Sequence, residues 1–100
     1  MSRQNEIEIV RDRLARGEIN LDRANVELVL VDRAYEVRGK IPRSVRNALS
    51  DAVKCGTLCH LRKDGAKPEV FYHPNFKYLA NEIRNRAVES LKRALIGCCK

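Results

Sequence analysis

Residues 42–73, PRSVRNALSDAVKCGTLCHLRKDGAKPEVFYH, decide the fold of this chain. In the first half of this segment, apolar side chains recur every three or four residues, which builds one buried stripe on a helix. The stripe consists of Val45, Ala48, Leu49, Ala52 and Val53. The pattern predicts a helix over residues 41–56, with Pro42 in its first turn or Ser44 as its N-cap, and with Gly56 as its stop.

After Gly56 the apolar residues change from a helical period to alternation, which is typical of strands. Two such segments, 57–62 and 68–73, flank the pair Asp64-Gly65. Glycine supplies the positive φ that a tight hairpin turn needs. Pro68 cannot donate to a strand ladder and marks an edge position. We therefore predict a two-stranded hairpin with a basic tip.

The segments before residue 42 are expected to be helical. Residues 4–16 carry an amphipathic pattern formed by Ile7, Val10, Leu14 and Ala15. Residues 21–38 are rich in β-branched side chains, which suit a strand as well as a helix. We interpret them as one long helix, with Asn20 or Asp22 as its N-cap and Gly39 as its end.

The last segment, residues 76–96, predicts a long amphipathic helix that either caps its own domain or pairs with a second copy. Its apolar positions outnumber what a small core needs, which favours a homodimer. The residues expected at that interface are Leu79, Ile83, Ala87, Leu91 and Leu95. Together the elements predict an α+β chain, mainly α, with one domain over residues 1–74 and a C-terminal helix over 75–100.

Residues 42–73 resemble the winged-helix (winged helix-turn-helix) DNA-binding family in its third helix and wing. The family pattern V-x-x-A-L-x-x-x-x-x-x-G-x-L is similar to the stretch from Val45 to Leu58, and the second strand ends in the aromatic pair Phe71-Tyr72. The resemblance implies a winged helix-turn-helix with a two-stranded hairpin as its wing and double-stranded DNA as its partner. The family's second helix is short, so the long segment 21–38 departs from it.

A helix that buries one apolar stripe must turn its polar side chains to solvent. The major groove of B-DNA admits such a helix and presents acceptors that Arg and Asn can pair with. We expect Arg46, Asn47 and Ser50 to contact base edges. Arg43, Ser44 and Lys54 suit phosphates at the two helix ends, and Arg62, Lys63 and Lys67 at the hairpin tip suit the DNA backbone. The family resemblance implies the same placement.

The distribution of charge along the chain also favours DNA as the partner. The chain has 100 residues and a net charge of +7. Residues 40–67 contain seven basic and two acidic residues, a net +5, whereas residues 1–39 contain seven basic and eight acidic residues, a net −1. A concentrated basic surface is typical of a protein with a polyanionic partner. Small transcriptional regulators that bind DNA fit this description.

The sequence leaves two alternatives to DNA as the partner, another protein and RNA. Winged helices also serve in protein–protein interaction, as adaptors or as phage-type inhibitors of another protein, because a fold does not dictate function. RNA is disfavoured because the chain has only five aromatic residues and no evident stacking platform.

Other chemistry has little support in the sequence. Cys55, Cys59, His60 and His73 invite a zinc site, but Cys59 and His60 are adjacent and point to opposite faces of a strand. Neither histidine has an evident acidic partner, and no phosphate-binding glycine loop is present. We therefore expect no enzyme activity, no metal and no cofactor. Without a signal peptide or a membrane-spanning run, a cytoplasmic protein with reduced cysteines is expected.

Overall fold

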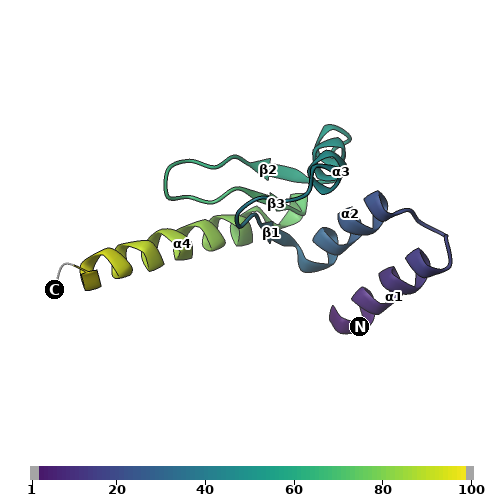
Figure 1. Ribbon diagram of the computed structural model, residues 1–100, viewed down its shortest axis with the longest axis horizontal. Coiled ribbons are helices and arrows are strands. Elements are labelled where there is room, and N and C mark those ends of the chain that lie inside the picture. The colour runs from purple at the N-terminus through teal and green to yellow at the C-terminus, as the bar shows by residue number, and fades with distance from the viewer. Residues whose placement is uncertain (1–2, 99–100) are drawn as a thin grey trace.

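A computed structural model describes residues 3–98 of the chain, with side chains from residue 3 to residue 93. Five helical segments and three short strands make up this described part of the chain (Figure 1). They are, in order, α1 (Arg3–Ala15), α2 (Leu21–Asp32), β1 (Ala34–Glu36), α3 (Arg43–Lys54), β2 (Cys59–Leu61), β3 (Val70–Tyr72), the 3-10 turn η1 (Pro74–Phe76) and α4 (Lys77–Cys98). The predicted class, α+β and mainly α, is confirmed.

The first correction concerns residues 21–38, which do not form one long helix. Asn20 caps α2 as expected, because its side chain accepts a hydrogen bond from the Arg23 amide at 2.8 Å. The helix ends at Asp32, and its C-cap Arg33 is a non-glycine residue in the left-handed region with a φ of 71°. The next three residues then form β1 instead of a further helical turn. The β-branched residues upstream lie in the helix, so local preference did not locate the boundary.

The second correction concerns the sheet, which has three antiparallel strands in the order β1-β3-β2 instead of two. The predicted hairpin is present, with Cys59 opposite Tyr72 and Leu61 opposite Val70. Its register is unbroken up to the bridge between Asp64 and Lys67, and Gly65 begins the turn with a φ of 56°. A positive φ at this position alone fits a type II′ hairpin turn.

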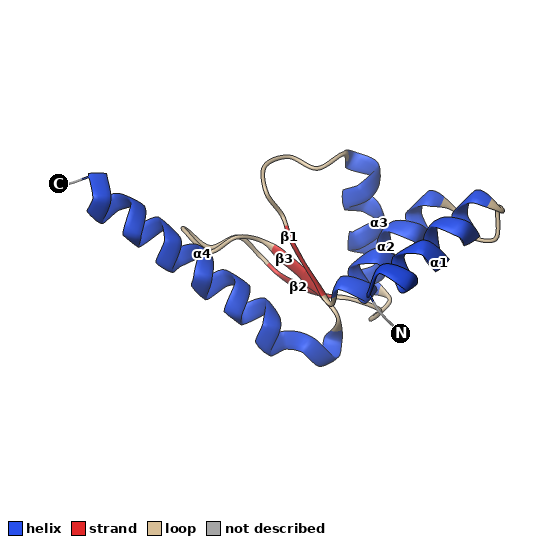
Figure 2. Cartoon of the chain, turned by 90° about the horizontal axis from the view of Figure 1, so that it is seen from below, coloured by secondary structure: helices blue, strands red, loops and turns tan. Residues whose placement is uncertain are grey.

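Helices cover both faces of the sheet, as Figure 2 shows: α2 and α3 lie on one side and α4 on the other. Strand alternation sends Phe71 into the cluster with Leu49 and Leu58, and sends Val70 and Tyr72 toward α4. All three residues of β3 are consequently buried. An apolar run without alternation is what a strand covered on both faces requires.

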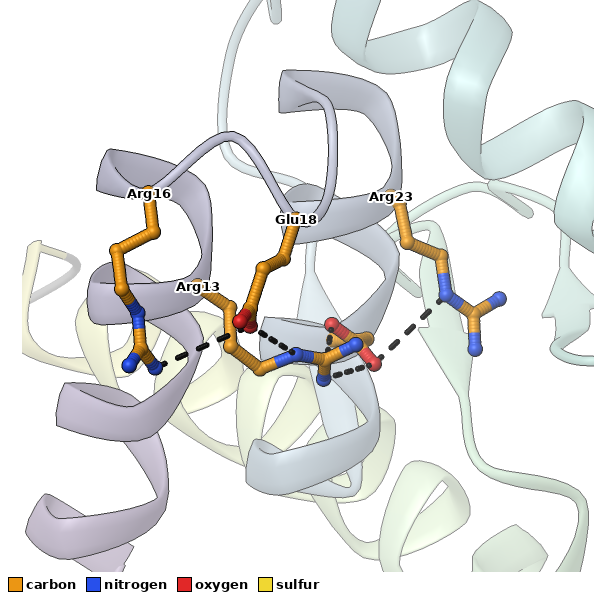
Figure 3. A network of polar contacts seen from close by, with 5 residues as sticks. Arg13, Arg16, Glu18 and Arg23 are labelled. Carbon is orange, nitrogen blue, oxygen red and sulfur yellow. Dashed lines mark hydrogen bonds and ion pairs between the residues drawn. The ribbon is translucent and has the colours of Figure 1, made fainter.

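The terminal helices are attached less deeply. In α1 Val10 is buried, Ile7 and Leu14 are half-buried, and two ion pairs join the helix to α2, Arg3–Asp32 and Arg13–Glu27. Figure 3 shows the network: Arg13 Nη1 donates to Glu27 Oε1 of α2 at 3.0 Å, and Arg16 and Arg23 flank this pair. At the other end, α4 packs through Ala80 on β3 and then runs out along the hairpin (Figure 1). The molecule is therefore elongated, 55 × 29 × 25 Å.

Candidate nucleic-acid interface

Helix α3 begins at Arg43, directly after Pro42, whose φ of −54° and ψ of 145° make it the N-cap. The predicted start at residue 41, with Pro42 in the first turn, is therefore wrong, and so is the alternative N-cap at Ser44. The residues that α3 buries are Ala48, Leu49 and Ala52, three of the five predicted for its apolar stripe, while Val45 and Val53 are half-buried. This stripe packs on α2 and on Phe71 of the sheet, so the opposite surface of α3 faces solvent.

Most of the predicted contact residues of α3 lie on that solvent-facing surface. The exposed ones are Arg43, Ser44, Asn47 and Lys54, and Ser50 is half-buried. One acidic residue, Asp51, is exposed among them. Lys40, in the loop that precedes α3, adds an exposed cation that our reading of the sequence did not single out. Exposed cations therefore lie at the first residue of α3 and in the loop before it, and the amide side chain of Asn47 follows one turn later.

Arg46 is placed differently from its neighbours. Its guanidinium makes a two-pronged contact with Glu69, with Nη2 donating to Oε1 at 2.9 Å and Nη1 to Oε2 at 3.2 Å. His60 Nε2 lies 2.6 Å from Glu69 Oε2, and the His60 ring stacks on Phe71 with centroids 4.4 Å apart. An ionised carboxylate can only accept hydrogen bonds, so Nε2 carries the proton.

The electrostatics of this triad follow from its geometry. Hydrogen bonds from Arg46 lower the pKa of the Glu69 carboxyl, burial opposes this shift, and the His60 contact adds to the lowering. The same bonds raise the pKa of Arg46. Glu69 is only 16% exposed, whereas 43% of the Arg46 side chain remains accessible. Arg46 therefore ties α3 to the base of the hairpin and keeps one edge in solvent.

Our sequence reasoning missed Glu69. The available signal was its isolation, because it is the one acidic residue between Asp64 and Glu82. Its partner Arg46 is 23 positions away, so only the tertiary structure brings the two together.

The hairpin tip carries the three predicted cations, Arg62, Lys63 and Lys67, and all three are exposed. Because the register is unbroken, Arg62 stands opposite Glu69 and shares the face of the hairpin that looks toward α3. From the other side, Arg84 of α4 donates through Nη2 to the Arg62 carbonyl at 3.1 Å, which braces the hairpin against α4. The structure thus links α3 to the hairpin through the Arg46–Glu69 contact and leaves the cations of the tip exposed.

The histidines and cysteines that could suggest a zinc site make other contacts or are free thiols. His60 contacts Glu69, and His73 accepts a hydrogen bond from the Asn75 amide at its Nδ1, 3.0 Å away. Cys55 and Cys59 are free thiols. Within residues 3–98, no three His, Cys, Asp or Glu side chains are grouped so that they could hold a metal ion.

The residues predicted for dimerisation divide into two groups. Leu79, Ile83 and Ala87 are half-buried, and Ile83 packs on the cluster of Val70, Tyr72 and Ala80 in its own chain. Leu91 is 46% exposed. The side chain of Leu95 lies outside the described residues.

No helix among the described residues has the length and apolar character needed to cross a membrane. Comparison of the chain with protein-family models, with curated proteins and with solved structures finds no match.

Proposed function

We propose that this protein is a small cytoplasmic transcriptional regulator that binds double-stranded DNA in the manner of a winged helix. In this proposal α3 enters the major groove and the tip of the β2–β3 hairpin contacts the phosphate backbone. The observation that carries it is the joint exposure of Arg43, Asn47 and Lys54 on α3 with the cations of the adjoining hairpin tip.

The arrangement of the elements supports this assignment. A major groove is wide enough for a helix that projects from its domain. The apolar stripe of α3 is sealed against α2 and the sheet, which leaves the polar side of the helix as a continuous outer surface. The hairpin follows α3 after four residues and is fixed to it by the Arg46–Glu69 contact. In this proposal α3 and the hairpin, joined by that contact, bind DNA together.

The Arg46–Glu69 contact changes the roles that we assign within the helix. A guanidinium already paired with a carboxylate must break that pair before it can bind guanine with both prongs. We therefore assign Arg46 to positioning the hairpin. Asn47, exposed and without such a partner, is assigned to base edges, and Arg43 at the helix start to a phosphate or an adjacent base.

Duplex binding, measured by fluorescence anisotropy at about 50 and about 200 mM salt, tests the proposal. The wild-type protein is expected to bind random duplex with an affinity that falls steeply with salt. Lys63→Gln should weaken binding to every sequence and reduce the salt slope by about one. Asn47→Ala should cost about 1–3 kcal/mol on a selected preferred site and less on random DNA.

The matched control is Arg11→Gln, which removes one charge from an exposed position on α1. It should leave the affinity and the salt slope close to those of the wild type. If Lys63→Gln behaves like Arg11→Gln, the hairpin is not part of the interface. A wild-type protein that ignores duplex DNA at low salt would refute the proposal and favour the protein-interaction alternative, whose apolar contacts respond little to salt.

A further inference from the structure

Among the described residues the sheet has two open edges, β1 and β2, and the edge of β1 is the one that borders a groove. In the order β1-β3-β2, β1 pairs only with β3. The backbone bonds to that neighbour run from the His73 amide to the Arg33 carbonyl, 2.8 Å, and from the Val37 amide to the Glu69 carbonyl, 2.9 Å. Antiparallel strands alternate the side to which their residues bond. The amide and carbonyl groups of Ala34 and Glu36 therefore point away from β3, toward the open edge.

A groove runs along this edge between β1 and α4. Its volume is about 820 Å³. The apolar part is formed by Ile83, Ala87 and Leu91, which follow one another at four-residue spacing and so share one face of the helix. Glu36 and Arg38 form its other wall, joined by a contact of 2.6 Å between Arg38 Nε and Glu36 Oε1.

We propose that a second copy of this chain occupies the open edge, so that the two β1 strands pair antiparallel about a two-fold axis at Tyr35. The outward-bonding residues flank Tyr35 symmetrically, one on each side. In the two-fold pair, Ala34 of one copy therefore stands opposite Glu36 of the other, and all four outward groups of each strand find partners. The two sheets join into one of six strands. An isologous interface needs this kind of self-complementary surface.

The side chains that line the groove are also compatible with a second copy of the chain. The Ala34 and Glu36 side chains share the α4 face of the sheet with Tyr72 and Val70, so the two α4 helices lie on one face of the joined sheet. Leu91, 46% exposed in the single chain, is then covered by its symmetry mate. The charged side chains that line the groove each have an opposite charge nearby: Arg38 contacts Glu36, and Arg86 lies 3.4 Å from Glu82, which limits repulsion between two identical copies.

An unpaired strand edge beside an exposed leucine is also a surface that natural proteins cover. Dimeric helix-turn-helix proteins read two half-sites about one helical turn apart, and the inferred dimer would supply that symmetry. The inference does not depend on the proposed function, however, because the pairing is measured without nucleic acid.

Sedimentation equilibrium of the full chain in reducing buffer, without nucleic acid, tests the inference. The decisive variant is Glu36→Pro, which removes an amide that points outward and leaves the bonds of Arg33 and Val37 to β3 intact. Its matched control is Glu36→Thr, which also loses the Arg38 contact but keeps the amide. We expect the wild type and Glu36→Thr to dimerise, and the dissociation constant of Glu36→Pro to rise at least about tenfold.

A second pair of variants probes α4. Leu91→Asp should weaken the dimer, whereas Leu21→Asp should leave it unchanged, because Leu21 is 59% exposed on α2 and lies outside the groove. A measurement on the wild type covers the case in which Glu36→Pro does not fold. Hydrogen exchange at the Ala34 and Glu36 amides should slow as the protein concentration rises.

A wild-type chain that stays monomeric at the highest concentration reached would overturn the inference. So would dimers of folded Glu36→Pro that are as tight as those of Glu36→Thr, or exchange at Ala34 and Glu36 that does not depend on concentration. Exchange that slows only when an extended peptide is added would assign the edge to a different partner.

Discussion

Helices α1 and α3 have nearly the same length, 13 and 12 residues, and both pack on α2, yet they bury different numbers of apolar residues. Helix α3 buries Ala48, Leu49 and Ala52 in the main apolar cluster. Helix α1 buries Val10 alone and leaves Ile9 43% exposed. It reaches α2 through the charged network of Figure 3.

The difference teaches which contacts carry the fold. Apolar burial stabilises by about 25 cal/mol per Å² of area removed from water. Exposed ion pairs contribute about 0–1 kcal/mol each, and salt screens them. The unit formed by α2, α3 and the sheet is consequently the stable core, and α1, with one buried residue and two ion pairs to α2, is attached more weakly. Three measurements can break or sharpen this comparison.

The largest effect is expected from Phe71→Ala. Phe71 is 1% exposed and joins α2, α3 and the sheet in one cluster. Its removal leaves a cavity and should lower the free energy of unfolding by about 3–5 kcal/mol in denaturant titrations. Ile9→Ala on α1, as the matched apolar truncation, should cost under about 1 kcal/mol. Equal losses in the two variants would mean that the exposed face of α1 is as integral to the core as β3.

An intermediate loss of stability is expected from Glu69→Gln, which removes the negative charge that Arg46 and His60 both contact. We expect the free energy of unfolding to fall by about 1–2 kcal/mol. The loss is limited because Arg46 is accessible enough to regain part of its hydration. The control Glu82→Gln breaks an exposed pair with Arg86 and should change the stability by under about 0.5 kcal/mol.

The same carboxyl predicts a pH dependence. The pKa of Glu69 is lowered in the folded state, chiefly by the Arg46 hydrogen bonds. Its contribution is therefore complete above the unfolded pKa of about 4.3 and is lost as the pH falls through the folded pKa. Between about pH 6 and about pH 3, the wild type should lose more stability than Glu69→Gln. Parallel pH profiles for the two proteins would contradict this.

The smallest effect separates α1 from α3 directly. At about 1 M salt the screening length shrinks to about 3 Å, so the pairs between α1 and α2 weaken. Amide hydrogen exchange in α1 should become faster, corresponding to a fall of under about 1 kcal/mol in the free energy of local opening. Exchange in α3 should stay unchanged. Arg13→Gln should produce the same change at low salt, because it removes the contact with Glu27. Equal responses in the two helices would show that charge does not distinguish them.

The sequence was informative where structure is local. The apolar stripe of α3, the stop at Gly56 and the turn at Gly65 depend on near neighbours along the chain, and the structure confirms all three. The exposure of the cations at the hairpin tip follows from the same local alternation. These features of the candidate site were readable because helix period and turn chemistry act over a few residues.

The sequence alone determined the class of the fold, the position of α3 and the hairpin, and the concentration of positive charge around them. Only the tertiary structure decided that Ala34–Glu36 form a third strand, that both faces of β3 are covered, and that Arg46 is bound to Glu69. The pairing of β1 with β3, the packing of Leu49 on Phe71 and the Arg46–Glu69 contact each join residues more than twenty positions apart. Such contacts depend on how the layers pack, and the period of the local sequence carries no record of that packing.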